Sequence, residues 1–91
     1  MSAIRITVRG RVQGVWFRGW TIEQARSRGL DGWVRNHHDG SVEALFSGPP
    51  DVVRAMVEAC RRGPPAALVT ALVESPADPP DRSGFYPLPT L

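Results

Sequence analysis

Lysine, cysteine and long apolar runs are absent or nearly absent from this 91-residue sequence. All 11 basic residues are arginines, a bias that we attribute to genome composition and not to function. The single cysteine, Cys60, excludes an internal disulfide and favours a reducing compartment. No apolar run is long enough for a membrane helix, and Met1–Val12 lacks the apolar core of a signal peptide. We therefore expect a soluble, cytoplasmic protein with no membrane partner.

The charge balance argues against an extended basic tail. The net charge is +2, so the chain is only mildly basic. Hydrophobic residues make up 42% and charged residues 22% of the chain, as is ordinary for a globular protein. Chains of this length usually form one domain with a small core, so we expect a single domain over residues 1–91.

Apolar periodicity and turn residues divide the chain into alternating strands and helices. Ile4, Ile6 and Val8 alternate with polar residues, as in a strand with one buried face, and Asp39-Gly40 is a strong hairpin signal. The predicted strands cover Ala3–Val12, Gly32–Asn36, Ser41–Phe46 and Leu68–Glu74, and the predicted helices cover Phe17–Arg28 and Asp51–Arg62.

This β-α-β-β-α-β order predicts an α+β fold of the ferredoxin-like type, a sandwich in which two helices pack on one face of an antiparallel sheet. A loop is expected over Ser75–Ser83. An extra C-terminal strand, if it forms, covers Phe85–Leu88. Because Pro87 and Pro89 have no N–H to donate, that strand must lie at an edge of the sheet.

The stretch Gly10–Arg18, GRVQGVWFR, joins the first strand to the first helix without a capping side chain. Its orphan N–H groups, the helix dipole and a nearby Arg18 together favour a bound anion, and we expect a phosphate. Two alternatives stay open. The helix could begin at Thr21, which forms a capping-box pattern with Gln24. The stretch could also be a tight turn beside a surface arginine.

GRVQGVWFR resembles the signature of the acylphosphatases, and so does GLDGWVRNHHDGSVEALFSGP at Gly29–Pro49. RRGPP at Arg61–Pro65 and SGF at Ser83–Phe85 are also similar to the family's pattern. The order and spacing of these blocks match, and the resemblance covers about residues 4 to 86. The final YPLPTL departs from the family, whose members usually end in a cleaner strand.

The resemblance implies hydrolysis of acyl phosphates to a carboxylate and inorganic phosphate, without a metal, a cofactor or a phosphoenzyme. It implies that Arg18 and Asn36 are catalytic, with Asn36 orienting the attacking water. It also implies a phosphate-binding loop made of Gln13, Gly14, Val15, Trp16, Phe17 and Arg18. The expected partners are the small-molecule substrate and inorganic phosphate, and we expect a monomer.

Proteins of the same fold could also have one of two other functions. The first is a non-catalytic module that binds anions or another protein, although such a module would not need an asparagine that places water. The second is RNA binding, but Ser41–Ser47 lacks the exposed aromatics that this function requires on its strand. We therefore expect no nucleic-acid partner.

Several conspicuous side chains have simpler structural interpretations. His37 and His38 are adjacent, so their side chains diverge and we expect no metal site. Trp16 stands where the family usually has a small residue. We expect it to pack on the rim of the loop; the alternative is that it narrows access. Ser41 is either an ordinary strand serine or a residue that supports Asn36 by a hydrogen bond. We expect Trp20 to be partly exposed, and Trp33 and Cys60 to lie in the core. Glu23 and Arg26 are expected to form an exposed ion pair.

Overall fold

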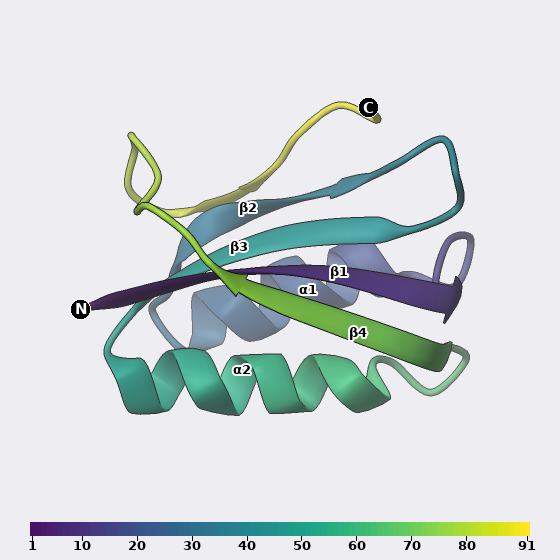
Figure 1. Cartoon of the computed structure of the whole chain (residues 1–91), viewed down its shortest axis with the longest axis horizontal. Coiled ribbons are helices and arrows are strands. Elements are labelled where there is room, and N and C mark those ends of the chain that lie inside the picture. Colours follow the sequence, from purple (N-terminus) through teal and green to yellow (C-terminus); the bar gives the residue numbers. More distant parts are fainter.

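The computed structural model describes residues 1–91 as five strands and two helices (Figure 1). Along the chain these are β1 (Ser2–Arg11), α1 (Phe17–Ser27), β2 (Asp31–Asn36), β3 (Val42–Gly48), α2 (Pro50–Arg62), β4 (Leu68–Pro76) and β5 (Phe85–Pro87). The predicted order is confirmed, with boundaries shifted by one or two residues. No helix is long and apolar enough to cross a membrane.

The sheet has the strand order β4-β1-β3-β2-β5, and both helices lie on the same face of it (Figure 1). The four strands of the predicted sandwich pair antiparallel, which confirms the ferredoxin-like fold. The added edge strand β5 forms over Phe85–Pro87 and runs parallel to β2, so the complete sheet is mixed. The chain continues beside β2 after β5, where Leu88 N donates to the Val34 carbonyl at 2.9 Å.

Strand register brings two distant segments to the same end of the sheet. Val42, the first residue of β3, pairs with Val8 of β1 on one side and with Asn36, the last residue of β2, on the other. The loop after β1 and the end of β2 therefore meet without their strands being neighbours. In Figure 1 this loop and the β2–β3 turn lie at the same end of the molecule.

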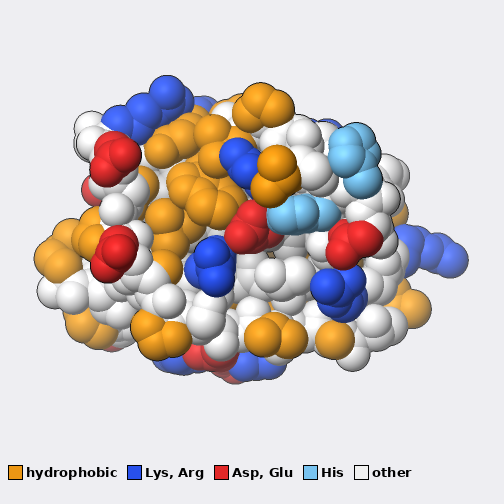
Figure 2. Space-filling view, turned by 45° about the horizontal axis from the view of Figure 1, so that its top comes forward, with side chains coloured by type: hydrophobic (Ala, Val, Ile, Leu, Met, Phe, Trp, Pro, Cys, Tyr) orange, Lys and Arg blue, Asp and Glu red, His pale blue; other side chains and the backbone are white.

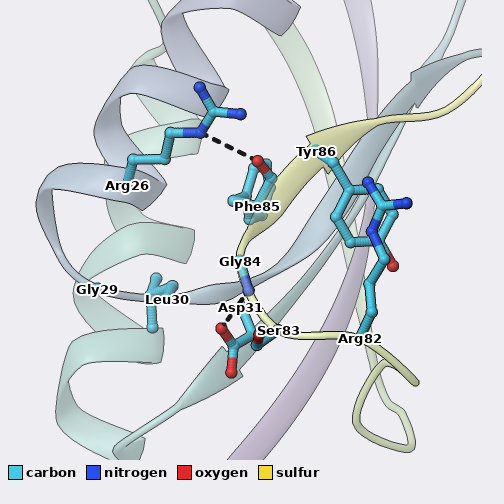
Figure 3. A pocket seen from close by; sticks show the side chains of 9 residues that line it. All are labelled: Arg26, Gly29, Leu30, Asp31, Arg82, Ser83, Gly84, Phe85 and Tyr86. Carbon is cyan, nitrogen blue, oxygen red and sulfur yellow. Dashed lines mark hydrogen bonds between the residues drawn. The ribbon is translucent and has the colours of Figure 1, made fainter.

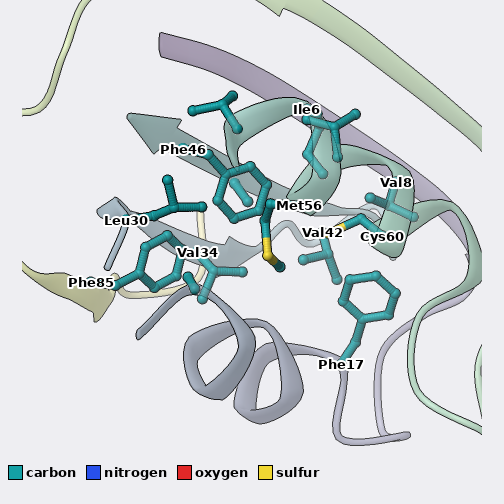
Figure 4. Close-up of a cluster of buried hydrophobic side chains, with 14 of the residues drawn as sticks. Ile6, Val8, Phe17, Leu30, Val34, Val42, Phe46, Met56, Cys60 and Phe85 are labelled. Atoms are coloured by element: carbon teal, nitrogen blue, oxygen red, sulfur yellow. The ribbon is translucent and has the colours of Figure 1, made fainter. Parts of the chain in front are cut away.

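The core lies between the sheet and the helices (Figure 4). The inward faces of the strands contribute Ile6, Val8, Val34, Val42 and Phe46, and the helices contribute Phe17, Ala25, Val53, Met56, Val57 and Cys60. Burial raises the pKa of the Cys60 thiol to about 12. The expected core position of Cys60 is confirmed, and a thiol with this pKa is a poor nucleophile.

Two predictions about side chains are wrong: the core position of Trp33 and the Glu23–Arg26 pair. Trp33 is half-buried on the open face of the sheet, because its neighbour Val34 faces the core and successive strand side chains point to opposite faces. The Arg35 guanidinium packs over the Trp33 ring, 5.3 Å from its centroid. Figure 2 shows apolar side chains gathered on this side, beside charged groups of both signs. Arg26 does not pair with Glu23; its Nε donates to the Phe85 carbonyl at 3.0 Å.

Candidate active site

The loop between β1 and α1 has an unusual backbone. Gly14 has φ 74°, and Trp16, the N-cap residue of α1, has φ 67° and ψ 22°, in the left-handed region. Alternation between left- and right-handed residues turns successive N–H groups toward one point, which forms an anion-binding concavity. Gly14 takes up such a conformation without a steric penalty.

Helix α1 begins at Phe17 with no side-chain cap and no acidic residue in its first turn. The alternative start at Thr21 is therefore wrong; Thr21 is buried within the helix, and its hydroxyl donates to the Phe17 carbonyl at 2.8 Å. The first helical bond runs from Trp20 N to the Trp16 carbonyl at 2.9 Å, and no turn or loop bond is donated by the N–H groups of residues 13–19. These N–H groups at the positive end of the helix remain free to bind a ligand.

Arg18 is exposed in the first turn of α1 and forms no ion pair with an acidic side chain. Asn36 ends β2, and its backbone is fixed on both sides: it pairs with Val42 of β3, and its carbonyl accepts from Leu91 N at 3.0 Å. Its side-chain Oδ1 is buried, yet no protein group donates a hydrogen bond to it. Buried acceptors of this kind are rare in folded proteins.

These groups line one cavity of about 320 Å³, a size at the lower end of the range typical of small-molecule sites. Its lining includes Gln13, Gly14, Trp16, Phe17, Arg18 and Asn36 from the predicted site, and also Val12, Gly19, Ile22 and Pro87. Val15 does not line the cavity; its side chain packs against the core. Phe17 is buried, so it can offer its N–H group but not an exposed ring.

Gln13 has a role that the sequence did not reveal. Its Nε2 donates to the carbonyls of His37 and Ser41, both at 2.8 Å. The side chain therefore tethers the loop to the β2–β3 turn, directly after Asn36. Because these partners lie 24 and 28 residues further along the chain, no local pattern could have pointed to them.

The β2–β3 turn is held by its own polar groups. Asp39 Oδ1 accepts from the hydroxyl of Ser41 at 2.6 Å and from its N–H at 2.9 Å. These two bonds, with a smaller contribution from Arg9, lower the pKa of Asp39 to about 2. Ser41 therefore supports the turn and forms no hydrogen bond with the Asn36 side chain. His37 Nε2 lies 2.8 Å from Glu43, and no group of three or more His, Cys, Asp or Glu residues is placed to hold a metal.

The family to which the chain belongs follows from a comparison with known proteins. The acylphosphatase family model matches residues 4–87. The chain belongs to the acylphosphatase family. The family and enzyme class expected from the motifs are thereby confirmed.

Relatives within the family match over nearly their whole lengths. The acylphosphatase of Rhodospirillum rubrum is 53% identical over 91 residues, which cover 100% of both chains. The crystal structure of acylphosphatase from Bacillus subtilis has a TM-score of 0.90 and 38% identity, covering 97% of this chain and 99% of that one. An acylphosphatase structure from Coxiella burnetii has a TM-score of 0.90 and 34% identity, covering 96% and 92%.

Proposed function

We propose that the cavity at the N-terminus of α1 hydrolyses acyl phosphates, with Arg18 and the loop N–H groups holding the phosphoryl group and Asn36 orienting the attacking water. The observation that carries this proposal is the convergence of uncommitted polar groups on one cavity. An uncapped helix start, an arginine without an ion pair and a buried amide oxygen without a donor all line it.

The phosphoryl group matches the donors in charge and geometry. The backbone N–H groups of residues 14–19 lie at the N-terminal, positive end of α1, where an anion is stabilised. The planar guanidinium of Arg18 can bind two phosphoryl oxygens at once. Donors that are fixed before the substrate arrives stabilise the charge of the transferring group in the transition state.

Asn36 is proposed to orient the attacking water because its amide oxygen lacks a hydrogen-bond donor and a water molecule can provide one. A water that donates to Oδ1 is oriented without being deprotonated, since an amide is no general base. Its oxygen then forms a bond to phosphorus as the bond from phosphorus to the acyl oxygen breaks. The electron pair leaves with the carboxylate, and the water proton passes to the phosphate product or to solvent.

This reaction needs neither a protein nucleophile nor a general acid. A carboxylate is a good leaving group without protonation, so positioning and charge stabilisation are sufficient. We therefore propose turnover without a metal or cofactor. A single domain, a monomeric state, a cytoplasmic location and the absence of nucleic-acid and membrane partners stay predictions.

The test is phosphate release from acetyl phosphate in the presence of EDTA, for the wild type, Arg18→Ala and Arg26→Ala. Arg26 is the matched control, because it lies on the same helix but at its other end, against Phe85 (Figure 3). We expect Arg18→Ala to lower kcat/KM by about 10²–10³-fold, as when one preorganised donor is removed. Arg26→Ala should keep kcat/KM near the wild-type value.

Two results would contradict the proposal. Equal losses of kcat/KM in Arg18→Ala and Arg26→Ala would show that Arg18 has no specific role in catalysis. Binding of inorganic phosphate without turnover by the wild type would instead identify a non-catalytic anion-binding module.

A further inference from the structure

The cavity has an apolar wall that the phosphoryl group does not need. Trp16 from the loop, Ile22 from α1 and Pro87 from β5 line it together with Arg18 and Asn36. Its volume of about 320 Å³ corresponds to on the order of ten water molecules, well beyond a phosphoryl group. Room therefore remains for the acyl part of the substrate, next to apolar side chains.

Trp16 is the most unusual part of this wall. It is the one non-glycine residue with positive φ, and 59% of the residue is exposed. A bulky residue in the left-handed region is strained, and core burial cannot compensate for this strain because the side chain is at the surface. Strain of this kind persists mainly at functional sites.

Gly19 lets the indole lie against the helix backbone where both residues line the cavity. A Cβ added to Gly19 would lie 2.6 Å from Trp16 Cδ1 and 2.8 Å from Cε2, so the indole rests directly on the helix backbone there. Glycine within a helix is less favourable than alanine. Two locally unfavourable residues, Trp16 and Gly19, thus combine to place one exposed aromatic ring beside the phosphoryl site.

We propose that Trp16, seated on Gly19, forms a wall that binds the acyl group and makes the enzyme favour aromatic acyl phosphates over short aliphatic ones. This inference rests on the proposed function, because it takes the phosphoryl group to be held by the loop and Arg18. An aromatic acyl group extending from that position meets the indole and the side chains of Ile22 and Pro87. A methyl group offers these side chains little surface.

The test measures kcat/KM for benzoyl phosphate and acetyl phosphate in the wild type, Trp16→Gly, Gly19→Ala and Trp33→Ala. Glycine tolerates the conformation at position 16, so the loop backbone keeps its shape. Trp33 is the control, since it lies on the open face of the sheet. The intrinsic reactivities of the substrates are the same for every variant, so the change in the benzoyl-to-acetyl ratio reports acyl binding.

We expect Trp16→Gly to lower this ratio by about two- to tenfold, the range of aromatic pair interactions. Gly19→Ala, which displaces the indole, should lower it as well, and Trp33→Ala should leave it unchanged. An unchanged ratio in Trp16→Gly overturns the inference. If the ratio falls in Trp16→Gly but not in Gly19→Ala, Trp16 binds the acyl group, and the part of the inference that assigns a role to Gly19 is overturned.

Failure of this inference can be told apart from failure of the proposed function. If Arg18→Ala abolishes turnover of acetyl phosphate while the ratio is unchanged in Trp16→Gly, the active site stands and the acyl wall does not. If Arg18→Ala retains the wild-type rate, the phosphoryl site itself is wrong, and the acyl wall is overturned with it.

Discussion

Two of the hollows that helix α1 borders lie at its opposite ends, and they differ in what their polar groups contact. The hollow at the C-terminal end, about 450 Å³ in volume, is lined by Arg26, Asp31, Arg82, Gly84 and others (Figure 3). Its polar groups bind one another: Asp31 accepts from Gly84 N at 2.8 Å, Arg26 donates to Phe85, and the Arg82 guanidinium lies 3.5 Å from the centroid of the Tyr86 ring.

The hollow at the N-terminal end is the smaller one, yet its groups lack such partners. The loop N–H groups, Arg18 and Asn36 Oδ1 all lack a hydrogen-bond partner within the protein. Volume therefore does not distinguish the proposed active site from a structural hollow in this protein. The distinction lies in whether polar groups are satisfied within the fold, and predictions about both hollows can test it.

The largest effect within this comparison is expected from the unpartnered oxygen of Asn36. Asn36→Ala removes the amide that we propose to orient water, so kcat should fall by about 10²-fold or more. KM should change little, because the proposal leaves phosphoryl binding to Arg18 and the loop. Steady-state kinetics on acetyl phosphate give both constants. His38→Ala is the control, since His38 is exposed in the turn directly after Asn36. An unchanged kcat in Asn36→Ala would show that the amide does not act on water.

A smaller effect is expected from the tether between the loop and the β2–β3 turn. Gln13→Ala removes two hydrogen bonds, each worth about 1 kcal/mol in the free energy of unfolding. It also frees the proposed phosphoryl-binding loop to move relative to Asn36, so kcat/KM should fall about tenfold, since small misplacements slow catalysis strongly.

The matched control is Asp31→Ala, which cuts the corresponding tether to Gly84 in the other hollow. It should lower the free energy of unfolding by about 1 kcal/mol and leave kcat/KM unchanged. Urea unfolding and steady-state kinetics, well below both melting temperatures, separate the two effects. If both variants lose activity in proportion to their stability, Gln13 is only a structural residue.

Most of the fold could be predicted because its signals are local. Alternating Ile4, Ile6 and Val8, the Asp39-Gly40 turn and the apolar stripe of α2 each determine an element within a short window. The position of Trp33 could not be derived in this way. Trp33 and Val34 are both apolar and adjacent, so only the packed structure decides which of them faces the core.

The candidate site likewise contains features with local sequence signals and features without them. The uncapped start of α1 and Arg18 are adjacent in sequence, and the motif predicts their proximity. The Gln13 tether, the wall formed with Pro87 and the parallel pairing of β5 depend on residues far apart in the chain. These features follow from the strand order, which places both ends of β2 beside segments that are distant in sequence.

The smallest expected effect concerns a carboxylate near the proposed active site that, like Asp31, is satisfied within the fold. Asp39 is bound by Ser41 and Arg9, and its pKa is about 2 instead of the ordinary 3.8. Because folding lowers this pKa, Asp39 stabilises the fold above about pH 4, and this stabilisation is lost as the pH falls through about 2. Asp39→Asn should thus have a lower melting temperature than the wild type at pH 7, and the difference should shrink toward pH 2.

Thermal unfolding at pH 7, 4, 3 and 2 measures this difference in melting temperature, with Asp78→Asn, at an exposed position, as the control. A constant difference across these pH values would mean that the charge of Asp39 does not support the turn. A shrinking difference would show that the turn next to Asn36 is stabilised by groups that, as in the other hollow, are bound within the fold.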